Sequence, residues 1–129
     1  MPFKHRVDEK LDVVIIKAIG EVSIMDIMSE IQEAIDTKRG DGITRRLVDM
    51  TDQEFIFNEA EARKILTLLQ VQGKLLRPKK VALLFKQIPE KFDFDKIRSL
   101  LNSEFLEIGV FTDKGNAITF LNSGSLKKD

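Results

Sequence analysis

The sequence predicts a single α/β domain built on a mainly parallel five-stranded sheet with one antiparallel edge strand. Two observations support this fold class. Short apolar runs, typical of buried strands, alternate along the chain with amphipathic helical periods. The length of 129 residues is that of one ordinary domain. The expected order of elements is β-β-α-β-α-β-α-β-α over residues 1–129, with a flexible tail at 123–129.

The first two strands are predicted to form an antiparallel hairpin. Residues 3–8 alternate, with Phe3, His5 and Val7 on one face, which indicates a half-buried strand at the sheet edge. A polar turn then leads into a strand over residues 12–19. Its continuous apolar run at 13–16 indicates burial on both faces.

From Ser23 the apolar residues follow a helical period. Ser23 is a natural N-cap, and Asp26 stands in a capping-box position. We expect Asp26, Glu30 and Glu33 to lie away from the buried stripe, in solvent. The stripe itself consists of Ile24, Ile27, Met28, Ile31 and Ile35.

The rest of the chain continues the alternation of strands and helices. Strands are expected at 46–50, 81–85 and 107–111, each centred on an apolar run. Helices are expected to begin at Asn58, Asp93 and Asp113, and the first of these ends before Pro78. Inward positions on these helices are Ala62, Ile65, Leu66, Leu69, Ile97, Leu100, Leu101, Ala117, Ile118 and Leu121.

Composition excludes several classes of function. Lysine plus arginine equals aspartate plus glutamate at 21 each, so no net charge favours nucleic acid. The absence of cysteine excludes disulfides, thiolate zinc sites and cysteine nucleophiles. No apolar run reaches the roughly 20 residues of a membrane span, and the start lacks the apolar core of a secretory signal. We therefore expect a cytoplasmic protein without integral membrane association.

Acidic residues at the expected strand ends raise the question of a magnesium site. The set is Glu21, Asp49, Asp52, Glu54 and Asp113. A receiver-like domain needs paired carboxylates after its first parallel strand, and Glu21 stands there by itself. The expected lysine is also missing after the last strand. We expect loop acids rather than a metal site, no cofactor and no enzymatic activity.

The most suggestive feature is a group of apolar residues in two expected strand-end loops. In open α/β sheets, ligands gather at the carboxyl ends of the strands. Phe57 and Phe92 precede helix caps, where they can pack as hydrophobic staples, so plain packing is an open alternative. The candidate ligand- or partner-binding residues are Phe55, Ile56, Phe57, Phe92 and Phe94.

Several segments together resemble the SpoIIAA-like family, relatives of the STAS domains of anti-sigma-factor antagonists. The matching pieces, in chain order, are Val14–Ser23, Leu47–Met50, Lys80–Phe85, Val110–Asp113 and Ala117–Leu121. The resemblance implies the STAS-like fold, a non-enzymatic binding or regulatory role, and a dimer. The family is also compared with CRAL-TRIO lipid carriers, which implies an apolar ligand.

The chain departs from the phosphorylated members of that family. Where they carry an acceptor serine, this chain has Asn58 and Glu59. Thr51 is the nearest hydroxyl and the sole candidate, so no phosphorylation is expected. Three functions stay open: a module that binds an apolar small molecule or a protein partner, a partner-switch protein of the anti-sigma-factor-antagonist type, and a magnesium-dependent receiver-like or enzymatic domain.

Overall fold

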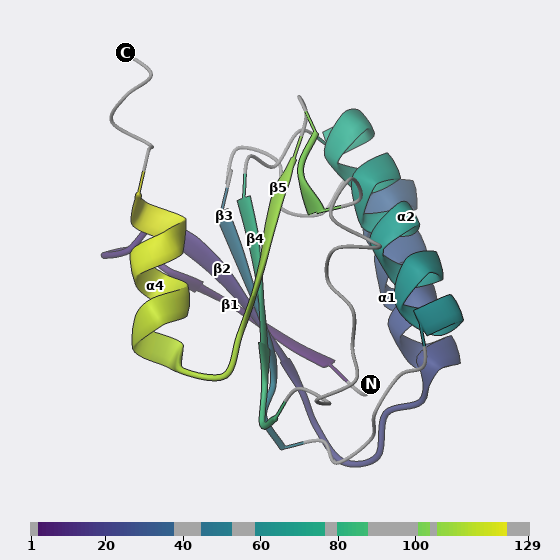
Figure 1. Cartoon of the computed structure of the whole chain (residues 1–129), viewed down its shortest axis with the longest axis horizontal. Coiled ribbons are helices and arrows are strands. Elements are labelled where there is room, and N and C mark those ends of the chain that lie inside the picture. The colour runs from purple at the N-terminus through teal and green to yellow at the C-terminus, as the bar shows by residue number, and fades with distance from the viewer. Residues whose placement is uncertain are drawn as a thin grey trace.

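The computed structural model describes residues 3–37, 45–52, 59–76, 80–87, 101–103 and 106–123. These residues form a five-stranded sheet with helices on both faces (Figure 1). The strands are β1 (Phe3–Asp8), β2 (Val13–Ala18), β3 (Arg45–Met50), β4 (Lys80–Phe85) and β5 (Glu107–Phe111). The helices are α1 (Ile24–Thr37), α2 (Glu59–Leu76) and α4 (Lys114–Asn122).

The strands lie in the order β1-β2-β3-β4-β5, which is also their order along the chain. β1 pairs antiparallel with β2 at the edge, and every other pair is parallel. The predicted fold class is therefore confirmed. The helix expected at Asp93, the loop aromatic residues and the tail from residue 124 lie outside the described residues.

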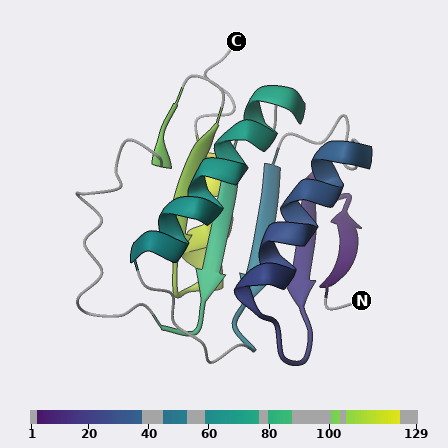
Figure 2. The same ribbon diagram turned by 90° about the vertical axis from the view of Figure 1, so that its right-hand side faces the viewer.

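α1 and α2 lie side by side across one face of the sheet, with β1 at the edge nearest α1 (Figure 2). The predicted inward residues Ala62, Ile65, Leu66 and Leu69 of α2 are all buried. Ile65, Leu66 and Leu69 belong to a cluster whose other buried members are Phe3, Ala18, Val22, Ile27, Ile31, Met50, Val81, Leu83, Leu106 and Ile108. This larger cluster is the main core of the domain.

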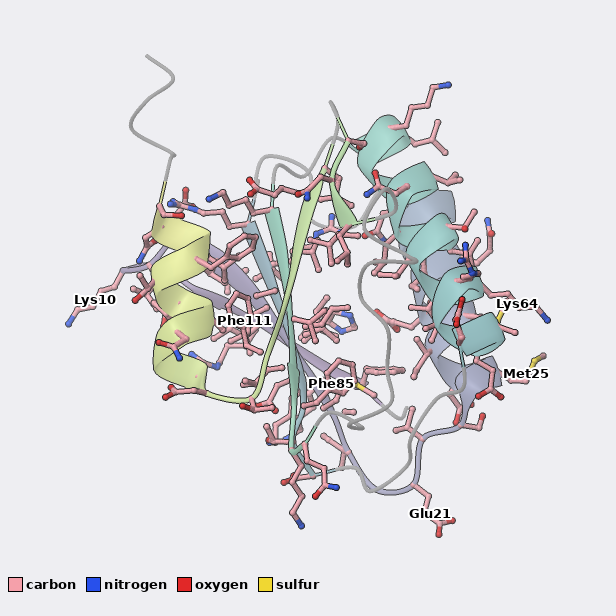
Figure 3. All side chains as sticks on the ribbon, in the orientation of Figure 1. Lys10, Glu21, Met25, Lys64, Phe85 and Phe111 are labelled. Carbon is pink, nitrogen blue, oxygen red and sulfur yellow. The ribbon has the colours of Figure 1, made fainter. Side chains whose placement is uncertain are left out.

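α4 covers the opposite face of the sheet. Ala117 and Leu121 of α4 are fully buried against Val13, Ile15, Leu47, Ala82 and Leu84. Phe85 and Phe111 point to opposite sides of the sheet (Figure 3), because one packs against the α1–α2 core and the other against the α4 core. None of the described helices is long and apolar enough to cross a membrane.

Local signals read from the sequence set the helix starts. The Ser23 hydroxyl accepts from the Asp26 backbone N–H at 3.1 Å, and the Asp26 carboxylate accepts from the Ser23 N–H at 3.0 Å. This reciprocal pair is the predicted capping box. Asp113 caps α4 by accepting from the backbone N–H groups of Gly115 and Asn116.

Candidate functional site

The five candidate residues predicted at the strand-end loops, Phe55, Ile56, Phe57, Phe92 and Phe94, lie outside the described residues. Their role as a ligand or partner surface stays a prediction. The order of the strands in the sheet is relevant to the strand-end rule on which this prediction rests. A crevice at the strand ends forms where the strand order reverses, and the order found here never reverses.

The structure instead has a cavity of about 70 Å³ between the sheet and the two helices of its larger core. Its walls are mostly apolar, with side chains from all of β1 to β4 and from α1 and α2. The apolar lining residues are Phe3, Val14, Ile16, Ile27, Ile31, Val48, Met50, Ile65, Leu69, Val81 and Leu83. The cavity therefore lies within the larger core, under the two helices.

Four polar side chains line the same cavity: His5, Glu30, Arg46 and Gln72. His5 Nε2 lies 2.5 Å from Glu30 Oε2, which ties the edge strand β1 to α1. The two side chains are 24% and 11% exposed, so this pair stands where the cavity meets solvent. Arg46 is deeper, at 4% exposure, and Gln72 at 3% donates to the Ile31 carbonyl at 3.5 Å.

The strand registers place these polar groups along the cavity. His5 is opposite Ile16, which is paired with Val48, so His5 is level with the middle of β3. Arg46 is paired with Val14 and Val81, two residues toward the amino end of β3. The polar groups thus lie from the middle of the sheet toward the amino ends of the parallel strands, away from the edge where the sequence predicted a site.

Glu30 corrects one expectation from the sequence. The helical period predicted that Glu30 faces solvent, but its side chain is largely buried and contacts His5. Glu30 directly precedes Ile31 and lies three residues after Ile27, so it stands at the border of the buried stripe. At such a border position, a partner on a neighbouring strand decides which way the side chain turns.

Sequence reasoning missed the whole polar set of the cavity, although two signals were present. His5 alternates with Phe3 on the inward face of β1. Arg46 is a charged residue directly before Leu47 and Val48 in a strand expected to be buried. A charge inside such a strand is costly unless other polar groups compensate it, so it indicates a polar site nearby.

A second polar cluster lies at the carboxyl ends of β2 and β3. Lys17 Nζ lies 3.5 Å from Asp49 Oδ2 and 3.3 Å from Asp52 Oδ2. Because Lys17 and Asp49 alternate with cavity-lining residues, they point to the α4 face of the sheet. The cluster is therefore separate from the cavity.

The charges of this cluster shift its pKa values. Burial by itself would raise the pKa of Asp49, but hydrogen bonds from Thr51 and the charge of Lys17 outweigh burial and lower that pKa below 3.8. Burial would likewise lower the pKa of Lys17. The hydrogen bond to Asp52 and the charges of both aspartates outweigh it and raise that pKa above 10.5.

Thr51 is hydrogen-bonded to Asp49 of this cluster. Its hydroxyl donates to Asp49 Oδ1 at 2.6 Å, and its backbone N–H donates to the same oxygen at 3.0 Å. A phosphate on Thr51 would place a charge of about −2 beside Asp49 and near Asp52. The repulsion agrees with the expectation that Thr51 is not a phosphorylation site, which stays a prediction.

The acidic residues considered for a magnesium site do not lie together in the structure. Asp49 and Asp52 share Lys17, whereas Asp113 caps α4 and Glu54 lies outside the described residues. Glu21 projects from the loop after β2 (Figure 3). Within the part of the chain that the structure describes, no three histidine or acidic side chains are placed to hold a metal ion.

Replacing Asp49 with asparagine is expected to lower the free energy of unfolding at pH 7 by about 1–2 kcal/mol, because charge-assisted bonds are lost. The folded-state pKa of Asp49 is lowered, so its contribution is present above pH 3.8 and is lost as the pH falls through the folded pKa. Urea denaturation at pH 7, 5 and 3 should show a smaller loss of stability on the acid side in the variant than in the wild type.

Glu21→Gln serves as the control for this measurement, because Glu21 is an exposed acid on the neighbouring loop. It should leave the stability at all three pH values within about 0.5 kcal/mol of the wild type. An Asp49→Asn variant with the same acid-side slope as the wild type would contradict the role assigned to Asp49.

Neither the protein-family models nor the curated proteins compared with the sequence match it. Among solved structures, the chain is similar to an uncharacterized protein of the DUF3478 family from Shewanella loihica PV-4, described as having a SpoIIAA-like fold. The match has a TM-score of 0.52 and 19% sequence identity, and covers 92% of this chain and 91% of that chain. The chain thus has a SpoIIAA-like fold, as the resemblance predicted.

Proposed function

We propose that this chain is a non-enzymatic binding module that takes a small apolar or amphipathic molecule into the cavity between the sheet and helices α1 and α2. The observation that supports the proposal is the composition of the cavity wall. Apolar side chains from six elements surround a few polar groups. Ligand sites commonly combine an apolar wall with a small number of polar groups that fix orientation.

The volume limits the size of the ligand. An apolar cavity of about 150 Å³ accommodates benzene, and this cavity measures about 70 Å³. A ligand that fits without displacing α1 or α2 therefore has only a few non-hydrogen atoms. A lipid-sized ligand would need the two helices to move away from the sheet.

Val48→Phe is expected to abolish binding by filling the cavity from the middle of β3, where Val48 lines it. The probe is 1-butanol, a small neutral amphipathic molecule, titrated into labelled protein and followed by NMR shifts of amides around the cavity. The variant should bind 1-butanol at least tenfold more weakly than the wild type. Its stability should change by less than about 2 kcal/mol, since overpacking costs about 1–3 kcal/mol and filling a cavity offsets part of that.

Ile118→Phe is the matched control for this experiment. Ile118 is partly buried in the α4 core on the opposite face of the sheet, so the same ring is added away from the cavity. The control should bind 1-butanol as the wild type does. Wild-type protein that fails to bind 1-butanol, or a Val48→Phe variant that binds it unchanged, would refute the cavity as the site.

Native mass spectrometry of the purified protein extends the test to ligands acquired in the cell. A small compound released on denaturation supports the binding function and reveals its chemical class. The same spectrum reports the number of subunits and so tests the expected homodimer.

A further inference from the structure

The outer edge of the sheet is formed by β1, which pairs with β2 along one side (Figure 2). Within the described residues, no strand pairs with the other side of β1. In an antiparallel pair, alternate residues direct their backbone N–H and C=O groups away from the partner strand. The outer side of β1 therefore presents a row of backbone donors and acceptors to which a further strand can be added.

The face of β1 turned away from α1 and α2 carries two cations. Lys4 and Arg6 alternate with the cavity-lining residues Phe3 and His5, so their side chains lie on the α4 side of the sheet. Both residues are exposed, and the side chain of Arg6 is 62% exposed. The buried residues described for the α4 core come from β2, β3, β4 and α4 and not from β1. α4 thus leaves both cations exposed to solvent.

Lys4 stands in a local excess of positive charge. It lies directly opposite Lys17 in the register of β1 and β2. The two aspartates of the Lys17 cluster, at 3.5 and 3.3 Å, compensate the charge of Lys17, whereas Lys4 forms no ion pair with any described residue. Like charges directly opposite each other on neighbouring strands are destabilising. An acidic residue beside Lys4 on an added strand relieves this repulsion.

We propose that the outer side of β1 binds an extended acidic segment of a protein partner by β-strand addition. The backbone of the segment pairs with β1, and acidic side chains at alternate positions lie beside Lys4 and Arg6. Side chains at the intervening positions lie on the α1 side of the sheet, beside Val7, which is 51% exposed. In β-strand addition, main-chain hydrogen bonds supply affinity and alternate side chains supply specificity. This surface adds a protein partner to the small-molecule function proposed for the cavity.

The charges of β1 argue against a second copy of this chain as the added strand. Two copies related by a twofold axis perpendicular to the sheet pair their β1 strands antiparallel, with residues of the same face opposite each other. One register that pairs most of the strand places Lys4 opposite Arg6 of the second copy. The other places Lys4 opposite Asp8 but Arg6 opposite itself. Both registers bring two cations together, whereas a strand with two alternate acidic residues meets a cation at each of them.

The two exposed cations set the expected selectivity. An exposed ion pair changes an equilibrium by about twofold to fivefold, so two pairs should favour an acidic segment over a neutral one by about tenfold. Such pairs are screened by salt. The affinity for the acidic segment should therefore fall about threefold when the salt concentration rises from about 0.05 M to about 0.5 M.

The probe is a blocked peptide, Thr-Val-Glu-Val-Glu-Val-Thr, in which valine and threonine favour extended structure and two glutamates occupy alternate positions. It is titrated into labelled protein and followed by NMR. The peptide should shift the amides of β1 and slow hydrogen exchange at alternate residues of that strand. The same peptide with lysine in place of both glutamates should bind at least tenfold more weakly. Equal binding of the two peptides, or binding that protects no amide of β1, overturns the proposal.

Charge-reversed variants test the role of the cations. Lys4→Glu should bind the acidic peptide at least tenfold more weakly and the lysine peptide more tightly. Because Lys4 lies opposite Lys17, this variant should melt no lower than the wild type, so the loss of binding is not a loss of folding. Lys64→Glu is the matched control, since Lys64 is an exposed lysine on α2, far from α4 (Figure 3). It should bind as the wild type does, and unchanged binding in Lys4→Glu overturns the proposal.

The free protein tests the other possible occupants of this edge. Without peptide, the amides on the outer side of β1 should exchange rapidly with solvent at every protein concentration. Protection that grows with protein concentration means that a second copy pairs with β1. Protection that is independent of concentration means that the chain covers its own edge. Either result overturns the proposal.

Discussion

Leu47→Ala is expected to lower the free energy of unfolding by about 3 kcal/mol, within the 2–5 kcal/mol typical of buried leucine. Leu47 is 0% exposed in the centre of β3 and faces the α4 core with Leu84 and Leu121. Truncation removes apolar contacts and leaves a void between the sheet and α4, which the surrounding strands cannot close. For a chain of this length the melting temperature should fall by roughly 10 °C.

Leu75→Ala is the control for the same chemical change. Leu75 lies on α2 and is 59% exposed, so its truncation should change the unfolding free energy by less than about 0.5 kcal/mol. Denaturant unfolding of both variants measures the difference. Equal losses in the two variants would contradict the assignment of Leu47 to a close-packed core.

The position of Leu47 also allows the effect of a substitution on stability to be distinguished from its effect on binding. Arg46 and Val48, its neighbours on both sides, point into the cavity, whereas Leu47 points to the α4 face. Leu47→Ala should therefore weaken folding while folded protein still binds 1-butanol as the wild type does. A parallel loss of binding would mean that the two cores on either side of the sheet are mechanically coupled.

The secondary structure could be predicted from the sequence because its signals are local. The capping box of Ser23 and Asp26 and the alternation of residues 3–8 depend on neighbours within a few positions. The turn that follows β2 is equally local, because Gly20 has a φ of 70°, a conformation that glycine adopts without strain. Such features need no knowledge of tertiary contacts.

The cavity could not be predicted in the same way, because its polar groups meet only through tertiary packing. His5 and Glu30 are 25 residues apart and come together through the antiparallel register of β1 on β2 and the path of α1 over the sheet. For Arg46 the obstacle is different. Both faces of a central strand are buried, so alternation indicates that its side chain is enclosed but not which core receives it.

The cavity lies away from the strand ends that the sequence analysis considered, and the topology of the sheet gives the reason. The strand-end rule applies to sheets in which successive connections pass to opposite faces at a reversal of strand order. Here the strands follow one another without reversal, and α1 and α2 cover the same face. The cavity lies beneath this helix pair, where His5, Arg46 and Gln72 line the wall.

Gly73→Ala is expected to destabilise the protein by about 2 kcal/mol, the reverse of the usual effect of alanine in a helix. Alanine is favoured over glycine by about 1 kcal/mol in a helix interior, and Gly73 lies in α2. A Cβ at this position, however, would lie 2.6 Å from Leu106 Cβ and 3.1 Å from its Cδ2. Overpacking of this kind typically costs 1–3 kcal/mol beyond any gain in propensity.

Leu106 has little room to move away from such a Cβ. It is 1% exposed, and its carbonyl accepts hydrogen bonds from the Ser103 N–H at 3.0 Å and from Gln70 Nε2 at 3.4 Å. The atom in closest contact is a Cβ fixed to the backbone, so a change of rotamer cannot relieve the clash. The end of α2 must shift instead, and with it Gln72, which lines the cavity.

Alanine and glycine placed at Thr67 supply the matched control, because Thr67 is an exposed position in the middle of the same helix. There alanine should be more stable than glycine by about 1 kcal/mol. Chemical denaturation of the four proteins (wild type, Gly73→Ala, Thr67→Ala and Thr67→Gly) decides the matter. Stabilisation by alanine at both positions would contradict the close approach of α2 to Leu106. A sign that reverses at Gly73 alone supports this contact as the limit on how closely the end of α2 packs against Leu106.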